Sequence, residues 1–395
     1  MGGEEAYRLT AEETAGVAAI RARFAQGELP NELNTDLNLR RWWHGWKGRV
    51  DEIEPRLRSY ITNRAAQGWD GEDFIERFYD IPTVNRYAKY FCWSKFNLQD
   101  STRNAVVLVE RLEGVENRRL LKVVPASEWL LLYFAFSEMM LRLVLRLEAE
   151  TGRPGGVVAI FDLEGGNLAD FRNPTSALNR IGALGAALVQ DWYPDLLLHC
   201  VFYRPPSFVN ALWQVCRLML NENTQKKILF LNSIQELRDV LSEEAIPEGF
   251  GGKARSEEDD ELSLAQYCVN RPLPVTPAAF FHPGRIVGGG VKLETEWLKP
   301  GKTVELRRSV TSVPARLRYQ FWLDGVCHFS LHRQTPSGGR EQLCASLSLY
   351  TPKIPEEKEL ELAKAGTYIF AFHNNSSYLL SIKLDHIIQI LPSAH

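Results

Sequence analysis

The spacing of hydrophobic residues changes twice along the chain, and each change predicts a different architecture. Up to about residue 90 apolar positions recur three and four residues apart, as at Ile53 and Leu57, which predicts helices. Thr10 and Glu13 form a capping-box start for the first of them. We therefore expect an N-terminal helical block over residues 1–90.

Beyond this block, short apolar runs alternate with longer helical patterns. The strand candidates are 106–109, 157–161, 196–203 and 227–231, and the helix candidates are 127–150, 174–191 and 234–241. Strands that alternate with helices favour a mainly parallel sheet with crossover helices. The pattern thus predicts an α/β domain.

The C-terminal part alternates apolar and polar residues with a period of two. Tyr368, Phe370 and Phe372 lead into a turn at 373–377, and the alternation resumes over 378–384, which predicts a hairpin of an antiparallel β-sandwich. An acidic run and a Pro-rich stretch precede this region. Four parts are thus predicted: a helical block (1–90), an α/β domain (91–256), a linker (257–283) and a β-sandwich (284–395).

Residues 205–220 form the most unusual segment. Read as a helix, Asn210, Gln214 and Arg217 make one narrow polar stripe, and the rest of the surface is apolar. A surface helix needs only a modest apolar face. Two interpretations remain open: a buried core helix, or a helix that covers a hydrophobic cavity and touches membrane when it opens.

Composition narrows the function classes. The chain has 395 residues and a net charge of −3, so no global basic field is present to hold nucleic acid. The apolar stretch 129–147 contains Glu138 and Arg142, which favours a buried helix over a membrane span. The six cysteines are scattered without a CxxC pair, and the N-terminus lacks an apolar signal. We expect a protein of the cytoplasm with reduced thiols.

Residues with catalytic or metal-binding potential do not form a set. On one strand His328 and His332 would lie roughly 13 Å apart, at about 3.3 Å per residue, too far to share an ion. Asp162 and Glu164 follow a central strand, where α/β sites often lie, but no histidine, cysteine or lysine completes an acid–base set. We expect Asp162 to accept hydrogen bonds from loop amides. Neither an enzyme nor a metal or cofactor is expected.

Several motifs of the α/β domain, in this order, resemble the CRAL-TRIO lipid-binding domain of the phosphatidylinositol/phosphatidylcholine transfer protein family. They are VLVER (107–111), IFDLEG (160–165), QDWYP (190–194), VFYRPP (201–206), NTQKKI (223–228) and PEGFGGK (247–253), with DLNLR (36–40) upstream. The tail, especially AGTYIFAFHNN (365–375), resembles a GOLD domain. CRAL-TRIO followed by GOLD is the layout of the supernatant protein factor group.

The resemblance implies that 205–220 is a mobile gate over an apolar ligand cavity. It implies a lining of Phe161, Tyr203, Phe208, Val209, Leu212, Trp213, Cys216 and Met219. Lys253 matches a headgroup lysine of the family, and Lys47 is a looser candidate. Tyr203 replaces a small residue of the family motif, which implies a bulky phenol at the cavity rim.

The implied function is binding of a phospholipid or isoprenoid-type lipid and its transfer or presentation between membranes. Transient contact with a membrane surface is expected, with the Golgi as one candidate. The alternative is a lipid-sensing adaptor that recruits a trafficking protein through the GOLD-like sandwich.

Overall fold

The computed structural model describes residues 7–209, 213, 214, 217, 220, 222–257, 261–282, 292–375 and 380–392, with the side chain of Asp170 left out. The N-terminal block contains α1 (Ala11–Arg21), α2 (Asp36–Gly45), α3 (Val50–Ala66) and α4 (Pro82–Tyr87), joined by the short turns η1 (Glu72–Phe74), η2 (Phe78–Asp80) and η3 (Ala88–Tyr90). Thr10 and Glu13 form the predicted capping box at α1.

One sheet organises the middle of the chain. Its strands are β1 (Cys92–Trp93), β2 (Gln99–Asp100), β3 (Ala105–Arg111), β4 (Gly156–Asp162), β5 (Leu197–Tyr203) and β6 (Ile228–Leu231). β3, β4, β5 and β6 are parallel neighbours in this order, and β1 and β2 both pair antiparallel with β3. The mainly parallel sheet is therefore as predicted.

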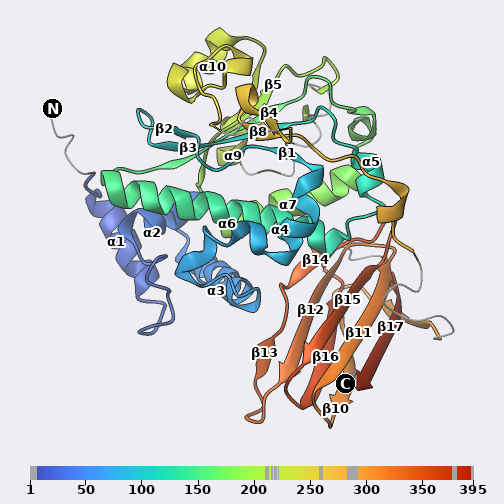
Figure 1. Ribbon diagram of the computed structural model, residues 1–395. Helices are drawn as coiled ribbons and strands as arrows, with labels where there is room; N and C mark the ends of the chain where they lie inside the picture. Colours follow the sequence, from blue (N-terminus) through green and yellow to red (C-terminus); the bar gives the residue numbers. More distant parts are fainter. Residues whose placement is uncertain are drawn as a thin grey trace.

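The crossover segments lie on both sides of this sheet. They contain α5 (Asn117–Leu120), α6 (Ala126–Thr151), η4 (Ala169–Arg172), α7 (Ala177–Trp192), α9 (Glu222–Lys226), α10 (Ile234–Val240), η6 (Glu243–Ala245) and η7 (Glu248–Phe250). Figure 1 shows α6 between the sheet and the N-terminal helices, with α7 on the same side and α10 on the other.

Helix α6 is the buried helix that its sequence predicts. Glu138, fully buried at its centre, accepts hydrogen bonds from Tyr60 on α3 and Tyr193 after α7, at 2.5 and 3.1 Å. Arg64 and Arg142 lie 3.1 and 2.8 Å from its carboxylate. Such pairing is what a charge inside a protein requires. Within the described residues, no helix combines the length and hydrophobicity needed to span a bilayer.

The segment predicted as a linker packs onto the α/β domain instead. It contains β7 (Ser263–Leu264), η8 (Ala265–Tyr267), β8 (Val269–Asn270) and η9 (Pro277–Ala279). Val269 and Val275 are buried, and the Val275 amide donates to Glu116 Oε2 at 2.8 Å. These apolar residues fix the extended chain although its many prolines suggest a spacer.

Two antiparallel sheets form the C-terminal part. One has the order β10 (Thr303–Val310), β16 (Gly366–His373), β12 (Cys327–Gln334) and β13 (Arg340–Gln342), with β14 (Leu347–Leu349) also on β12. The other has the order β15 (Glu356–Leu362), β11 (Ala315–Leu323), β17 (Ile382–Pro392) and β9 (Glu294–Leu298). Phe321 meets Phe329 and Phe372 across the sheets at ring distances of 4.9 and 5.1 Å.

The predicted hairpin at 373–377 is wrong, because β16 and β17 belong to different sheets. Asn374 is buried where the chain leaves β16, and its side-chain amide donates to the carbonyls of Leu298 and Leu380 at 2.9 and 3.1 Å. These bonds join the end of β16 to β9 and to the chain entering β17, so the segment crosses between sheets.

The sandwich is fastened to the helices rather than hung from a tether. Glu356 of β15 accepts hydrogen bonds from the Ser127 amide, at 2.8 Å, and from the Ser127 hydroxyl in the first turn of α6. Asn63 of α3 accepts from Gln342 and from the Ser346 amide at 3.0 and 2.6 Å. Figure 1 shows this contact at one end of α6.

Candidate functional site

The register of the sheet separates two rows of side chains. Trp93, Glu110, Phe161, Phe202 and Phe230 are successive partners across β1, β3, β4, β5 and β6. Residues paired directly in a sheet place their side chains on the same face. We call these five residues the aromatic row. The next position of each strand, which faces the opposite way, gives the second row: Cys92, Arg111, Asp162, Tyr203 and Leu231.

The aromatic row is a continuous stack that is only half-buried. The rings of Phe161 and Phe202 lie 5.6 Å apart at 27°, and those of Phe202 and Phe230 lie 5.4 Å apart at 16°. Trp213 from the segment 205–220 meets Phe230 at 5.6 Å. Inner strands of a parallel sheet normally have both faces covered. Accessible aromatic surface at the centre of this sheet therefore indicates space beside it.

Helix α6 approaches the same face. Trp93 and Phe136 of α6 lie 3.8 Å apart. Burial raises the pKa of Glu110 to about 7, against a hydrogen bond with Trp93 that lowers it. Burial also raises the pKa of Tyr133 on α6, and the charge of Glu110 adds to that rise. The pKa of the Cys200 thiol is raised to about 12 by burial and again by Glu110. These three groups therefore share one poorly solvated region.

The second row is a closed charge network. Asp162, fully buried, lies 2.9 Å from Arg111 and 2.6 Å from Arg204. Its Oδ1 also accepts the amide of Glu164 at 3.2 Å, so the predicted role as an acceptor for loop amides is confirmed. The Arg111 guanidinium lies 3.8 Å from the Tyr267 ring centre. These contacts hold the carboxyl end of β4 in place and propose no chemistry.

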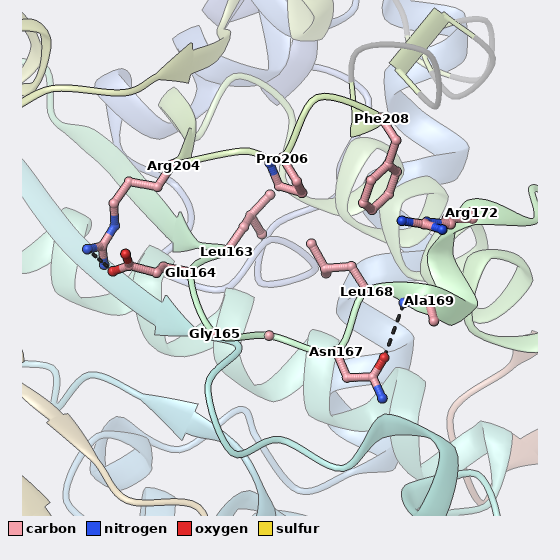
Figure 2. A pocket seen from close by; sticks show the side chains of 11 residues that line it. Leu163, Glu164, Gly165, Asn167, Leu168, Ala169, Arg172, Arg204, Pro206 and Phe208 are labelled. Carbon is pink, nitrogen blue, oxygen red and sulfur yellow. Dashed lines mark hydrogen bonds and ion pairs between the residues drawn. The ribbon is translucent and has the colours of Figure 1, made fainter.

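A pocket of about 480 Å³ opens where β4 and β5 end. Figure 2 shows the loop after β4, with Gly165, Asn167 and Leu168, opposite Pro206 and Phe208. The Arg172 guanidinium lies 4.8 Å from the Phe208 ring centre. The pocket thus lies where the segment 205–220 begins, and its wall is part apolar and part charged.

The predicted lining residues have different outcomes. Phe161 lies in the aromatic row, Trp213 touches that row, and Phe208 lines the pocket. Val209 is half-buried, and its amide donates to the Pro206 carbonyl at 3.0 Å. The other three, Leu212, Cys216 and Met219, lie outside the described residues, as does most of the predicted gate.

Tyr203 is a correction. It lies in the second row, is 5% exposed, and packs on Phe250 of η7 at a ring distance of 5.1 Å. Its phenol therefore points to the opposite face from Phe161. β5 is apolar along its whole length, so its sequence does not show which residues face which side.

The two headgroup candidates lie apart and are both paired with acids. Lys47 lines a second pocket of about 260 Å³ together with His44, Asp195 and Glu222, and its ammonium lies 3.8 Å from Glu222. Lys253 lies 3.6 and 3.3 Å from Glu243 and Glu244. Their side chains are 67% and 61% exposed.

Other predicted features form no centre. His328 and His332 are half-buried rather than solvent-facing, and they contact Ser346 and Ser330 at 2.8 and 2.9 Å. In the described part of the chain, no three His, Cys, Asp or Glu side chains are placed to hold a metal ion.

Sequence reasoning missed Glu110, Tyr133, Cys200, Phe202 and Phe230. The alternation in 107–111, with Glu110 between apolar residues, was the available signal for the first of these. The others depend on which strands and helices become neighbours.

Comparison with known proteins agrees with this geometry. Residues 115–252 match the family model of the CRAL/TRIO domain. A CRAL-TRIO domain-containing protein of Caenorhabditis elegans is 28% identical over 99% of this chain and 100% of its own length. Another from the same nematode is 30% identical over 55% of this chain and 53% of its own. The crystal structure of Sfh5 aligns with 68% of this chain and 91% of its own at a TM-score of 0.41 and 15% identity.

The chain therefore contains a CRAL-TRIO domain. Domains of this kind generally bind and transfer lipophilic ligands, and their family members are generally not enzymes. The aromatic row and the 480 Å³ pocket both lie on elements within the matched residues, apart from β1 and β3.

Proposed function

We propose that this chain binds a lipophilic molecule between the aromatic row and the segment 205–220, and transfers or presents it between membranes. The observation that carries the proposal is the half-buried stack of Phe161, Phe202 and Phe230 with Trp213 against its edge. Burial of an alkyl chain contributes roughly 0.8 kcal/mol per CH₂, so such a surface holds a lipid without covalent chemistry.

Exchange would take place at a membrane surface. The segment 205–220 acts as a gate: it opens against the bilayer, admits the lipid and closes behind it. Gln214 and Arg217 are exposed, as expected for the polar stripe of such a helix, while Trp213 is half-buried. A phospholipid and an isoprenoid-type lipid both fit this scheme. We place the protein in the cytoplasm with transient visits to membranes, the Golgi among them.

The test is a comparison of two tryptophans. Protein purified gently from cells should carry lipid that organic extraction and mass spectrometry detect. Trp213→Asp places a charge against Phe230 and should lower bound lipid and vesicle-to-vesicle transfer at least tenfold. Trp297→Asp in β9 changes a 58% exposed residue and should leave both unchanged. Absence of lipid, together with failure to bind added lipids, would reject the proposal.

A second candidate function uses the C-terminal sheets. They resemble a GOLD domain in sequence, and Glu356 and Asn63 tie them to α6 and α3. A lipid-dependent shift of α6 would therefore reach the sandwich directly, as a lipid-sensing adaptor requires. Full-length protein should then retain a trafficking partner in its lipid-loaded form and release it after delipidation. Equal retention in both forms would reject this candidate.

A further inference from the structure

Glu110 is an acidic residue in the middle of an otherwise aromatic row. Its register partners are Trp93 on one side and Phe161 on the other. Trp93 supplies the one side-chain hydrogen bond that acts on its pKa. Across the described part of the chain no lysine or arginine forms an ion pair with it. Asp162, one position along on the opposite face, has two guanidinium partners. A buried carboxyl without such partners is unusual, because an unsatisfied polar group costs free energy.

Tyr133 of α6 faces the region of Glu110. Its ring packs on α7, where a Cβ added to Gly185 would lie 2.7 Å from Tyr133 Cδ2. The side chain nevertheless keeps 38% of its surface accessible. Burial still raises the pKa of its phenol, and the charge of Glu110 raises it further. Accessible surface together with poor solvation is what a residue lining an enclosed space shows.

We propose that Glu110 and Tyr133 together bind the hydroxyl group of a lipid alcohol, which enters the space beside the aromatic row with its polar end at Glu110. This inference rests on the proposed function and adds the ligand class. The ligand hydroxyl donates to the Glu110 carboxyl and accepts from the Tyr133 O–H, and its hydrocarbon part lies along Phe161, Phe202 and Phe230.

The chemistry of the site favours an alcohol over its alternatives. A pure hydrocarbon would leave the carboxyl of Glu110 and the hydroxyl of Tyr133 without partners in a dry region. A lipid amine would have to bury an ammonium beside the carboxylate, and desolvation offsets most of that attraction. Burial already favours the neutral carboxyl of Glu110, whose pKa is raised to about 7, and a neutral acid exchanges hydrogen bonds with an alcohol without any ion.

Three matched probes test this assignment: geranylgeraniol, its methyl ether and geranylgeranylamine, each titrated into delipidated full-length protein. The ether keeps an acceptor oxygen and loses the donor. Wild-type protein should bind the alcohol roughly 10- to 100-fold more tightly than the ether, the range that one buried hydrogen bond provides. Glu110→Leu and Tyr133→Phe should each reduce this preference to below about threefold and still bind the ether.

The control is Glu113→Leu, which removes a carboxylate of the same length with a 58% exposed side chain and should keep the full preference. Glu110→Gln is the second variant: it retains an acceptor and should keep part of the preference if Glu110→Leu does not fold. Equal binding of alcohol and ether by wild type would overturn the inference and leave the proposed function standing. Tighter binding of the amine would overturn the alcohol assignment. If none of the probes binds, the proposed function fails as well.

Discussion

The two faces of the central sheet treat buried charge in opposite ways. On one face Asp162 is closed in by Arg111 and Arg204, and the network leaves nothing for a ligand. On the other face Glu110 lies among aromatic rings with Trp93 as its neighbour. The residues are adjacent in register, and the strand period of two sends them to opposite sides. A charge that the protein satisfies itself is scaffold, and a polar group left open faces the ligand.

The largest effect should come from breaking the closed face. Asp162→Ala leaves Arg111 and Arg204 beside each other without their shared carboxylate, and loss of one partner of a buried pair costs about 3–5 kcal/mol. Urea denaturation followed by circular dichroism measures this loss. The matched control is Glu164→Ala, which also pairs with Arg204 but is 59% exposed, and should cost less than about 1 kcal/mol. Similar costs for both variants would contradict a closed network at Asp162.

The open face should show its carboxyl in the pH dependence of stability. The folded pKa of Glu110 is raised from 4.5 to about 7, so the folded state holds this proton more tightly than the unfolded state. The free energy of unfolding should therefore fall as pH rises from about 5 to 8, by about 1–3 kcal/mol from this group. Glu110→Gln should remove that part of the slope in the ligand-free protein. An unchanged slope would show that Glu110 is well solvated.

Glu356 separates burial from ligand binding. Its pKa is also raised to about 7 by burial, but the Ser127 amide and hydroxyl already bind its carboxylate. Its pKa shift has the same sign, so Glu356→Gln should also flatten the decline of stability between about pH 5 and 8, by no more than about 1–3 kcal/mol. Lipid binding at fixed pH should not change. A loss of lipid binding in Glu356→Gln would break the distinction between satisfied and open carboxyls.

Local pattern predicted the elements and not the faces. Strand candidates 106–109 and 157–161 fall within β3 and β4, and the helix candidate 127–150 within α6, because period and length are local properties. The orientation of Tyr203 was wrong, since its apolar strand carries no alternation and its neighbours come from elsewhere in the chain.

The polar partners needed the same non-local information. Glu110 is one of 49 acidic residues in the sequence, and only pairing with β1 and β4 places it among aromatic rings. The segment 263–270 was misread for a related reason: proline content suggests a spacer, whereas burial of Cys268 and Val269 depends on the sheet beneath them.

The smallest effect is expected at the two lysines. A lipid phosphate at Lys253 would have to compete with Glu243 and Glu244, and one at Lys47 with Glu222. Exposed pairs of this kind contribute about 0–1 kcal/mol, so Lys253→Ala and Lys47→Ala should leave stability nearly unchanged. Each should lower transfer of an anionic phospholipid between vesicles by no more than about threefold, and transfer of geranylgeraniol not at all. A loss above tenfold for the phospholipid alone would move the main polar contact of the ligand from Glu110 to the surface, and the contrast between the two sheet faces would then describe stability only.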